Sequence, residues 1–440
     1  MTTALAPVAA TAESLADALV GAYNHSGLLD QNRALLRAAD EDVAQAVATL
    51  RPVWTYTAQL RHTIPDRGAA STTRSFEIGM EWLLFNGGQR ELRIEELKET
   101  VLATRQDLIA VEQTLLGDAV DAYMDVRSAA EFVQLRKNNV RVITEELRAA
   151  RDRFDVGEVT RTDVALAESR LAQARSGLAG AEGTLARSVA TYRNVIGRAP
   201  GSLVQPRSLP ALPASVAKAR AIAHRSHPDL LAVRHAAAAA ELAVLRAQAS
   251  LNPSLTLSGG RTFEPDEESN SIGLRLSGPI SSGGQIRSQI RQVEARRDSA
   301  LARIHVTRHL IDQNIEFAYA NLAVARASRE ASERQIRAAR VAFRGVREEA
   351  TLGARTTLDV LDAEQDLLDA QTNLVQSVTD EFKAAYSVLE AAGLLTATYL
   401  KLGVQQYDPV AYYNSVKDAP NAISEQGKAL ERVLQSIGKN

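Results

Sequence analysis

A row of charged side chains in the C-terminal half of the sequence is the strongest candidate for a functional site. Arg355, Asp359, Asp362, Asp366 and Asp369 follow one another at intervals of four, three, four and three residues. On a helix this spacing places all five on one face. Carboxylates that line a narrow passage attract cations. The alternative is a solvated helix face with a local pair between Arg355 and Asp359, worth about 0.3 to 0.5 kcal/mol.

Other reactive groups form no recognisable site. His305 and His309 lie one helical turn apart, but HVTRH lacks the glutamate of a zincin and no third ligand is near in sequence. We interpret these two residues as surface histidines. The glycine pairs of the chain lack the Lys-Ser/Thr of a phosphate-binding loop, and no nucleophile and base can be paired. We therefore expect no enzymatic activity, no cofactor and no bound metal.

The acidic row belongs to a segment that occurs twice. The stretch VGEVTRTDVALAESRLAQ (156–173) matches LGARTTLDVLDAEQDLLDAQ (352–371) when Gly157 is laid on Gly353. The same alignment lays Gly197 on Gly393. Only the second copy carries the full acidic row. A repeat of about two hundred residues is far longer than a solenoid unit, so the sequence predicts two fused halves.

Composition favours long helices and limits the possible partners. Hydrophobic residues make up 45% of the 440 residues, but aromatic residues make up only 5%. The 51 basic and 53 acidic residues nearly balance, and no basic patch is interleaved with aromatics, so we expect no nucleic-acid partner. The chain has no cysteine, which excludes disulfides, thiolate metal sites and a lipid-modified N-terminal cysteine.

Membrane insertion, if it occurs, must come from strands, because no run of eighteen or more apolar residues exists. Alternating patterns predict strands at about 53–61, 74–85, 254–261 and 271–279. The first two strands form a hairpin with an aromatic face, and each is long enough for a tilted bilayer crossing. We expect four side chains on this face to contact lipid: Trp54, Tyr56, Phe76 and Trp82. The alternative is a soluble hairpin covered by a helix.

The rest of each half is helical. The pattern from Ser14 to Leu50 is helical, and from Gln89 to about Phe154 the chain continues without proline, on the order of 100 Å of helix at 1.5 Å per residue. Gly157 then marks a turn, and the returning segment has leucine and alanine at three-four spacing, typical of a coiled-coil seam.

These features divide the chain into five parts. Ala10-Thr11-Ala12 has the form of a signal cleavage site, so we interpret 1–12 as a leader remnant; the alternative is a flexible alanine-rich terminus. The remaining parts are a first repeat (13–197), a proline-rich linker (198–213), a second repeat (214–395) and a C-terminal tail (396–440) without a repeat partner, which either wraps the body or is mobile.

Four strands cannot close a barrel, and an open edge in hydrocarbon leaves unpaired backbone groups that each cost several kcal/mol. Several chains must therefore share one barrel, with cyclic symmetry.

The sequence resembles the TolC-type outer-membrane channels of Gram-negative export systems from Glu13 to about Leu402. The strongest matches are RFDVGEVTRTDV (153–164), LSGPISSGGQIRSQIRQ (276–292) and LGARTTLDVLDA (352–363). The resemblance implies a mainly α-helical chain whose duplicated coiled-coil hairpins form a periplasmic tunnel. It also implies a homotrimer, in which each chain contributes four strands to a shared twelve-stranded barrel in the outer membrane.

The resemblance further implies a function and a set of residues. A periplasmic adaptor protein and an inner-membrane ABC transporter or other pump would dock at the helical tips, around Gly157, Glu158, Gly353 and Ala354. Asp359 and Asp362 match the family's constricting acidic pair, each present three times around the axis, and Asp366 and Asp369 would extend that lining. The residues that match the family's closing contacts are Arg355, Thr162 and Asp163. Ala350 replaces a tyrosine common in the family, so the latch itself differs here.

Type I protein secretion is the route that this resemblance favours, since the chain lacks a lipidated cysteine. The alternatives are a duct for drugs and other small molecules and, more remotely, a soluble coiled-coil scaffold.

Overall fold

The computed structural model describes residues 13–437 except 65, 266 and 422–423. The expected leader and its cleavage site lie outside the described residues. The chain forms two compact units, each assembled from three separate stretches. Unit 1 takes in residues up to 30, 109–227 and 309–406, and unit 2 takes in 31–108, 228–308 and 407 onward.

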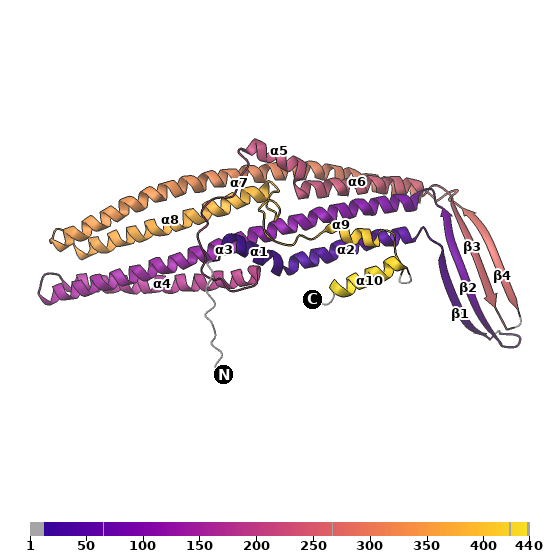
Figure 1. The fold of residues 1–440 in the computed structure, drawn as a ribbon, viewed down its shortest axis with the longest axis horizontal. Coiled ribbons are helices and arrows are strands. Elements are labelled where there is room, and N and C mark those ends of the chain that lie inside the picture. The colour runs from indigo at the N-terminus through magenta and orange to yellow at the C-terminus, as the bar shows by residue number, and fades with distance from the viewer. Residues whose placement is uncertain (1–12, 65, 266, 422–423, 438–440) are drawn as a thin grey trace. The chain divides into compact units, whose positions relative to one another are not determined.

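The described chain is mainly helical with one four-stranded sheet, which confirms the predicted fold class (Figure 1). In chain order the elements are α1 (Leu15–His25), α2 (Gly27–Ala48), β1 (Val53–Thr63), β2 (Ser71–Phe85), α3 (Gln89–Asp155), α4 (Arg161–Ile196), α5 (Val216–Ser226), α6 (Pro228–Ala249), β3 (Ser254–Phe263), β4 (Glu268–Ser277), α7 (Gln285–Thr351), α8 (Thr357–Ala391), α9 (Pro409–Val416) and α10 (Glu425–Ile437).

The duplication is visible in the lengths of the helices. α3 and α7 each have 67 residues and begin 196 residues apart, while α4 and α8 have 36 and 35. α1 and α5 have 11 residues each, and α2 and α6 have 22 each, but these pairs are 201 residues apart. The offset changes across the strands, because β2 has 15 residues and β4 only 10.

The helical pattern predicted from Ser14 to Leu50 is interrupted at Ser26. This residue has extended backbone angles (φ −68°, ψ 104°), and its hydroxyl accepts a hydrogen bond from the N–H of Leu29 at 3.2 Å. A side chain that satisfies the first free N–H groups of a new helix favours such a break. Two helices, α1 and α2, therefore replace one.

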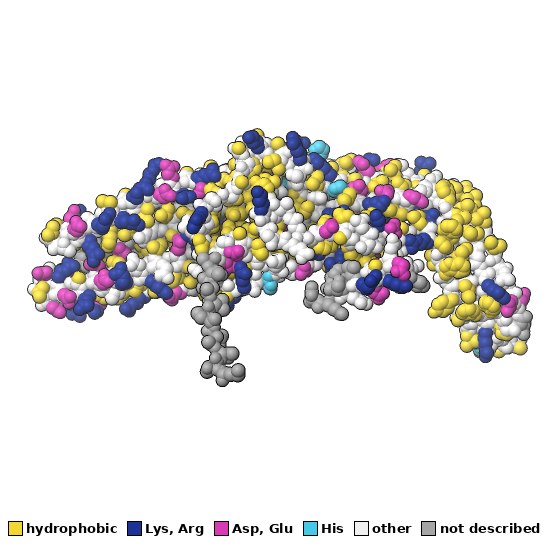
Figure 2. Space-filling model, viewed as in Figure 1, with side chains coloured by type: hydrophobic (Ala, Val, Ile, Leu, Met, Phe, Trp, Pro, Cys, Tyr) yellow, Lys and Arg dark blue, Asp and Glu magenta, His cyan; other side chains and the backbone are white. Residues whose placement is uncertain are grey.

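The sheet in unit 2 is antiparallel throughout, in the order β1-β2-β3-β4. Trp54 pairs with Met80, Tyr56 with Ile78, and Trp82 with Leu257. Paired residues share a face of a sheet, so one face is continuously apolar. Hydrophobic side chains cover much of the sheet in Figure 2, and Trp54 and Tyr56 are 68% and 78% exposed.

Unit 1 contains the turn regions of two helical hairpins, α3 with α4 and α7 with α8. Leucine and alanine residues of α3 and α4 form a core at the first hairpin, and Leu361 of α8 joins it. In the second hairpin, Ala318 and Leu322 of α7 pack against Ala385 and Val388 of α8. The mixture of leucine and alanine lets the helices approach closely.

Candidate functional site at the hairpin turns

The two hairpins turn by the same local mechanism. Gly157 ends α3 with a φ of +81°, and Gly353 ends α7 with a φ of +77°. The N–H of Glu158 donates to the carbonyl of Arg153 at 2.9 Å, and the N–H of Ala354 donates to the carbonyl of Glu349 at 2.9 Å. No atom would crowd a Cβ at either glycine. The positive φ alone therefore explains the glycines.

Each returning helix begins with a reciprocal cap. Asp163 lies three residues after the N-cap Thr160, accepts hydrogen bonds from its N–H (2.9 Å) and hydroxyl (2.7 Å), and donates its own N–H to that hydroxyl. Thr356 and Asp359 repeat the arrangement at 2.9 Å and 2.8 Å. These hydrogen bonds satisfy N–H groups that a helix start leaves free.

The caps also act on the charge of the two aspartates. Hydrogen bonds from the side chain and backbone of Thr160 lower the pKa of Asp163. Hydrogen bonds from the backbone and side chain of Thr356 lower the pKa of Asp359, and Arg355 adds a smaller electrostatic effect. Both carboxylates are therefore ionised at neutral pH. The sequence analysis missed this capping role, although the spacing T-x-x-D signals it.

The acidic row lies on the outer side of α8. Asp362, Asp366 and Asp369 are exposed. Asp362 is bound to Arg170 of α4 at 2.7 Å, and Gln365 donates to Asp369 at 2.8 Å. The acidic row is therefore partly engaged with neighbouring side chains.

The predicted closing residues do not come together within the chain. Arg355 forms its ion pair with Glu349 of the same hairpin at 2.8 Å, and Thr162 is exposed on α4. The expected local pair between Arg355 and Asp359 is present only as an electrostatic influence. Ala350, the position where the family has tyrosine, is buried.

A buried polar group joins the two hairpins, and the sequence analysis did not identify it. Glu364 of α8 is 5% exposed and accepts a hydrogen bond from Asn139 of α3 at 3.4 Å. Arg347 of α7 pairs with Glu146 of α3 at 3.7 Å. Burial raises the pKa of Glu364. A glutamate at three-four spacing within the apolar stripe Leu361, Glu364, Leu368 is the signal that could have revealed it.

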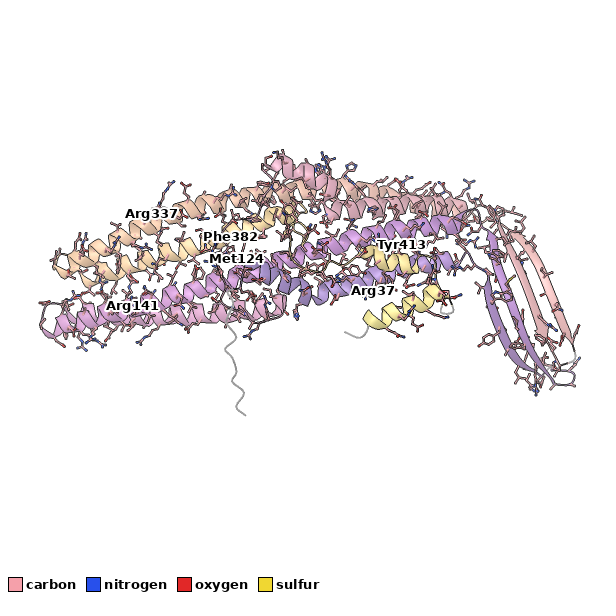
Figure 3. All side chains as sticks on the ribbon, in the orientation of Figure 1. Arg37, Met124, Arg141, Arg337, Phe382 and Tyr413 are labelled. Atoms are coloured by element: carbon pink, nitrogen blue, oxygen red, sulfur yellow. The ribbon has the colours of Figure 1, made fainter. Side chains whose placement is uncertain are left out.

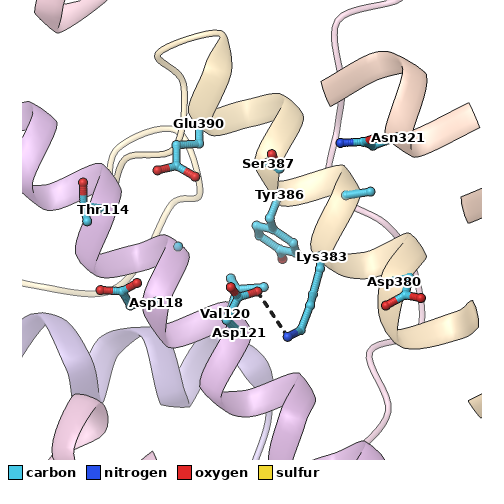
Figure 4. A pocket seen from close by; sticks show the side chains of 12 residues that line it. Thr114, Asp118, Val120, Asp121, Asn321, Asp380, Lys383, Tyr386, Ser387 and Glu390 are labelled. Atoms are coloured by element: carbon cyan, nitrogen blue, oxygen red, sulfur yellow. Dashed lines mark ion pairs between the residues drawn. The ribbon is translucent and has the colours of Figure 1, made fainter. Parts of the chain in front are cut away.

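Two cavities of unit 1 adjoin these helices. One, of about 810 Å³, is lined by both turns, including Glu158, Asp163 and Arg355. The other, of about 350 Å³, lies between α3 and α8 (Figure 4). There the Lys383 ammonium lies 3.6 Å from Asp121 and 2.7 Å from Asp125. Burial raises the pKa of Asp121, whereas Lys383 lowers it.

The predicted lipid-contacting side chains lie on the sheet of unit 2. Phe76 and Trp82 are 40% and 37% exposed, and the Trp82 indole donates to the carbonyl of Leu50 at 2.9 Å. An indole with an exposed ring and a satisfied N–H suits a boundary between apolar and polar surroundings.

Two searches concern other kinds of site. Across the described residues, no helix combines the length and the apolar character needed to span a membrane. In the same part of the chain, no three His, Asp or Glu side chains are grouped so that they could hold a metal ion. His305 and His309 are both exposed on α7.

The sequence matches the family model described as outer membrane efflux protein over residues 20–198 and 220–393. The outer membrane efflux protein BepC of Brucella suis is 37% identical, over 94% of this chain and 93% of that protein. The alkaline protease secretion protein AprF of Pseudomonas aeruginosa is 28% identical, over 66% of this chain and 63% of its own length. The solved structure of CusC has a TM-score of 0.77 at 19% identity, over 87% of this chain and 92% of that one, which shows the shared fold.

Proposed function

This chain belongs to the outer membrane efflux protein family, and from that premise we propose that it is the outer-membrane duct of a type I protein secretion route. It is an outer-membrane protein, and members of its family are trimeric channels that work with an adaptor and an inner-membrane pump. The observation that carries the proposal is the combination, in one chain, of an open sheet with an apolar face and two long helical hairpins.

The edges of the sheet support a shared barrel. β1 and β4 are the outer strands of the described sheet, and each pairs on one side only. Unpaired backbone groups in hydrocarbon cost several kcal/mol each, so β1 of one copy must pair with β4 of the next. Three copies supply the twelve strands of the trimeric barrel known for the family.

The acidic row supports a gate at the hairpin turns. In a trimer, Asp359 and Asp362 would each be present three times around the axis, where like carboxylates attract multivalent cations. The ion pair between Asp362 and Arg170 joins α8 to α4 inside one subunit, so it opposes separation of the two hairpins. We propose that this pair, with the buried Glu364, holds the turns of each subunit together in the closed duct.

The hairpin turns also support a docking site for the adaptor or pump. Leu352 and Val156 are 85% and 71% exposed beside the two turn glycines. Glu158 and Ala354 occupy equivalent places in the two turns, directly after the glycines. Tryptophan at either position keeps the glycine and its φ but adds bulk, so capture of a tagged adaptor should fall. Capture equal to that of the wild type would argue against docking there.

The route is tested by deleting the gene and supplying it again from a plasmid. For protein secretion, the deletion strain should lose one or more proteins from the culture medium and regain them on complementation. Small-molecule efflux is the second candidate, which the extensive likeness to BepC favours. Increased sensitivity to drugs and dyes with an unchanged set of secreted proteins would replace the first route by the second.

A further inference from the structure

Unit 2 contains a carboxylate that is fully enclosed without a hydrogen bond. Asp40 of α2 is 0% exposed, and neither of its carboxylate oxygens has a hydrogen-bond partner in the described part of the chain. Its nearest opposite charge is the Arg105 guanidinium of α3, 4.0 Å away. A buried carboxylate in this state favours its neutral form, because ionisation there is poorly compensated.

The C-terminal segment 407–418, which contains α9, packs over this site. Tyr407 and Tyr413 contact the apolar core that α2 and α3 form. The Arg33 guanidinium lies 5.4 Å from the centre of the Tyr407 ring, and that of Arg105 lies 5.4 Å from the centre of the Tyr413 ring. Figure 3 labels Tyr413 on α9.

Two further contacts hold the same segment. The Tyr412 hydroxyl donates to the Glu41 carboxylate at 2.7 Å. The Arg51 guanidinium donates to the backbone carbonyls of Asp418 and Ala419, the latter at 2.7 Å. The segment is therefore attached on both sides of Asp40, through residues that precede and follow it in α2 and its C-terminal extension.

The second repeat provides a natural comparison. α2 and α6 have equal length and lie 201 residues apart, which lays Asp40 on Glu241. Glu241 is exposed, and the C-terminal segment exists only once in the chain. Enclosure of the acid thus accompanies the segment, and the acid of the uncovered repeat remains in solvent.

We propose that Asp40 is an acid-responsive fastening for segment 407–418, which docks more tightly on α2 and α3 when this carboxyl is protonated. Protonation removes a buried negative charge that has only one close cationic partner. The groups that face Asp40 are Arg37 and Glu41 from α2, Arg105 from α3, and Tyr407 and Tyr412 from the segment.

The direction of the pH effect follows from these surroundings. Burial raises the pKa of Asp40 to about 6; Arg105 opposes this effect and Glu41 adds to it. A group whose pKa is higher in the docked than in the released state favours docking as the pH falls. Docking should therefore strengthen between pH 6 and pH 4 and change little above pH 7. A shift of two pKa units corresponds to about a hundredfold change in the docking equilibrium at most.

Hydrogen exchange of the full-length protein in detergent tests this proposal, with protection expressed relative to the intrinsic rate at each pH. In the wild type, amides of 409–418 should be protected more strongly at pH 5 than at pH 7.5, by about tenfold. Asp40→Asn should give strong protection at both pH values, and the matched control Glu241→Gln should behave as wild type. Glu41→Gln removes a charge that raises the pKa of Asp40, so it should move the transition to lower pH.

Equal protection of the wild type at the two pH values would overturn the proposal, whatever the variants do. A pH response of wild-type size in Asp40→Asn would overturn it as well, because the response would then come from another group.

Discussion

The two hairpin turns have the same backbone and cap but opposite surroundings. Glu168 and Glu364 lie 196 residues apart at equivalent positions. Glu168 is exposed and pairs with Arg151 at 2.5 Å, whereas Glu364 is buried against Asn139 of the other hairpin. Duplication has therefore kept what the turn needs locally. The contact between hairpins has determined which of two identical side chains is buried.

The shared features are those that depend on nearby residues only. A positive φ at glycine and a threonine cap three residues before an aspartate operate within one turn of chain. The differing features depend on residues far apart in sequence. Arg170 occupies the position equivalent to Asp366, and Leu166 occupies the position equivalent to Asp362, so only one combination across the hairpins forms an ion pair.

The largest difference between the repeats should appear when the equivalent glutamates are removed. Glu364→Ala leaves a cavity and an unpaired Asn139 amide, so we expect a loss of about 2 kcal/mol in unfolding free energy. Glu168→Ala removes only a surface pair, worth less than about 1 kcal/mol. Urea unfolding in detergent measures both. A Glu364→Ala variant as stable as the wild type would mean that the desolvation of Glu364 outweighs its contacts.

The next effect concerns block of the channel by multivalent cations. Replacing both Asp359 and Asp362 with asparagine should weaken the block of single-channel current by about tenfold, because each substitution removes three charges near the axis. Asparagine retains an oxygen that can cap the helix, which alanine would lose. Asp163→Asn, the equivalent cap in the first repeat, is the control. Unchanged block in planar bilayers would reject the acidic constriction.

The turn glycines should show the similarity of the repeats. Gly157→Ala and Gly353→Ala each force a Cβ into a positive φ without any clash, so each should cost about 1 kcal/mol of stability. Thermal unfolding of the two variants compares them directly. A cost confined to one turn would show that the two glycines are not equivalent in the assembled duct.

A charge exchange tests the ion pair between the hairpins. Asp362→Arg and Arg170→Asp should each raise the resting conductance several-fold, since each places like charges together, and the double exchange should restore it. Asp366→Arg, at the position equivalent to Arg170, is the control. A double variant that conducts like the single variants would show that the pair does not hold the turns.

The smallest effect is expected at Arg355. Arg355→Ser removes the exposed pair with Glu349 and should raise resting conductance modestly, because exposed pairs contribute less than about 1 kcal/mol. Glu349→Gln removes the same pair from the other side. A larger effect of Arg355→Ser would indicate a second partner, in a neighbouring subunit.

The sequence by itself determined the duplication, the helical hairpins, the alternating strands and the turn glycines. These follow from periodicity and from backbone conformations that few residues accept, so they are encoded within short stretches. It also showed the acidic row, although the capping function of Asp359 was overlooked.

Only the tertiary structure decided which polar groups are buried and which of them meet. Asp40 is enclosed because a tail 370 residues later packs near it, and Glu364 is enclosed because α8 contacts α3. Their repeat counterparts, Glu241 and Glu168, remain exposed. Burial depends on contacts between distant segments, and no local spacing specifies those contacts.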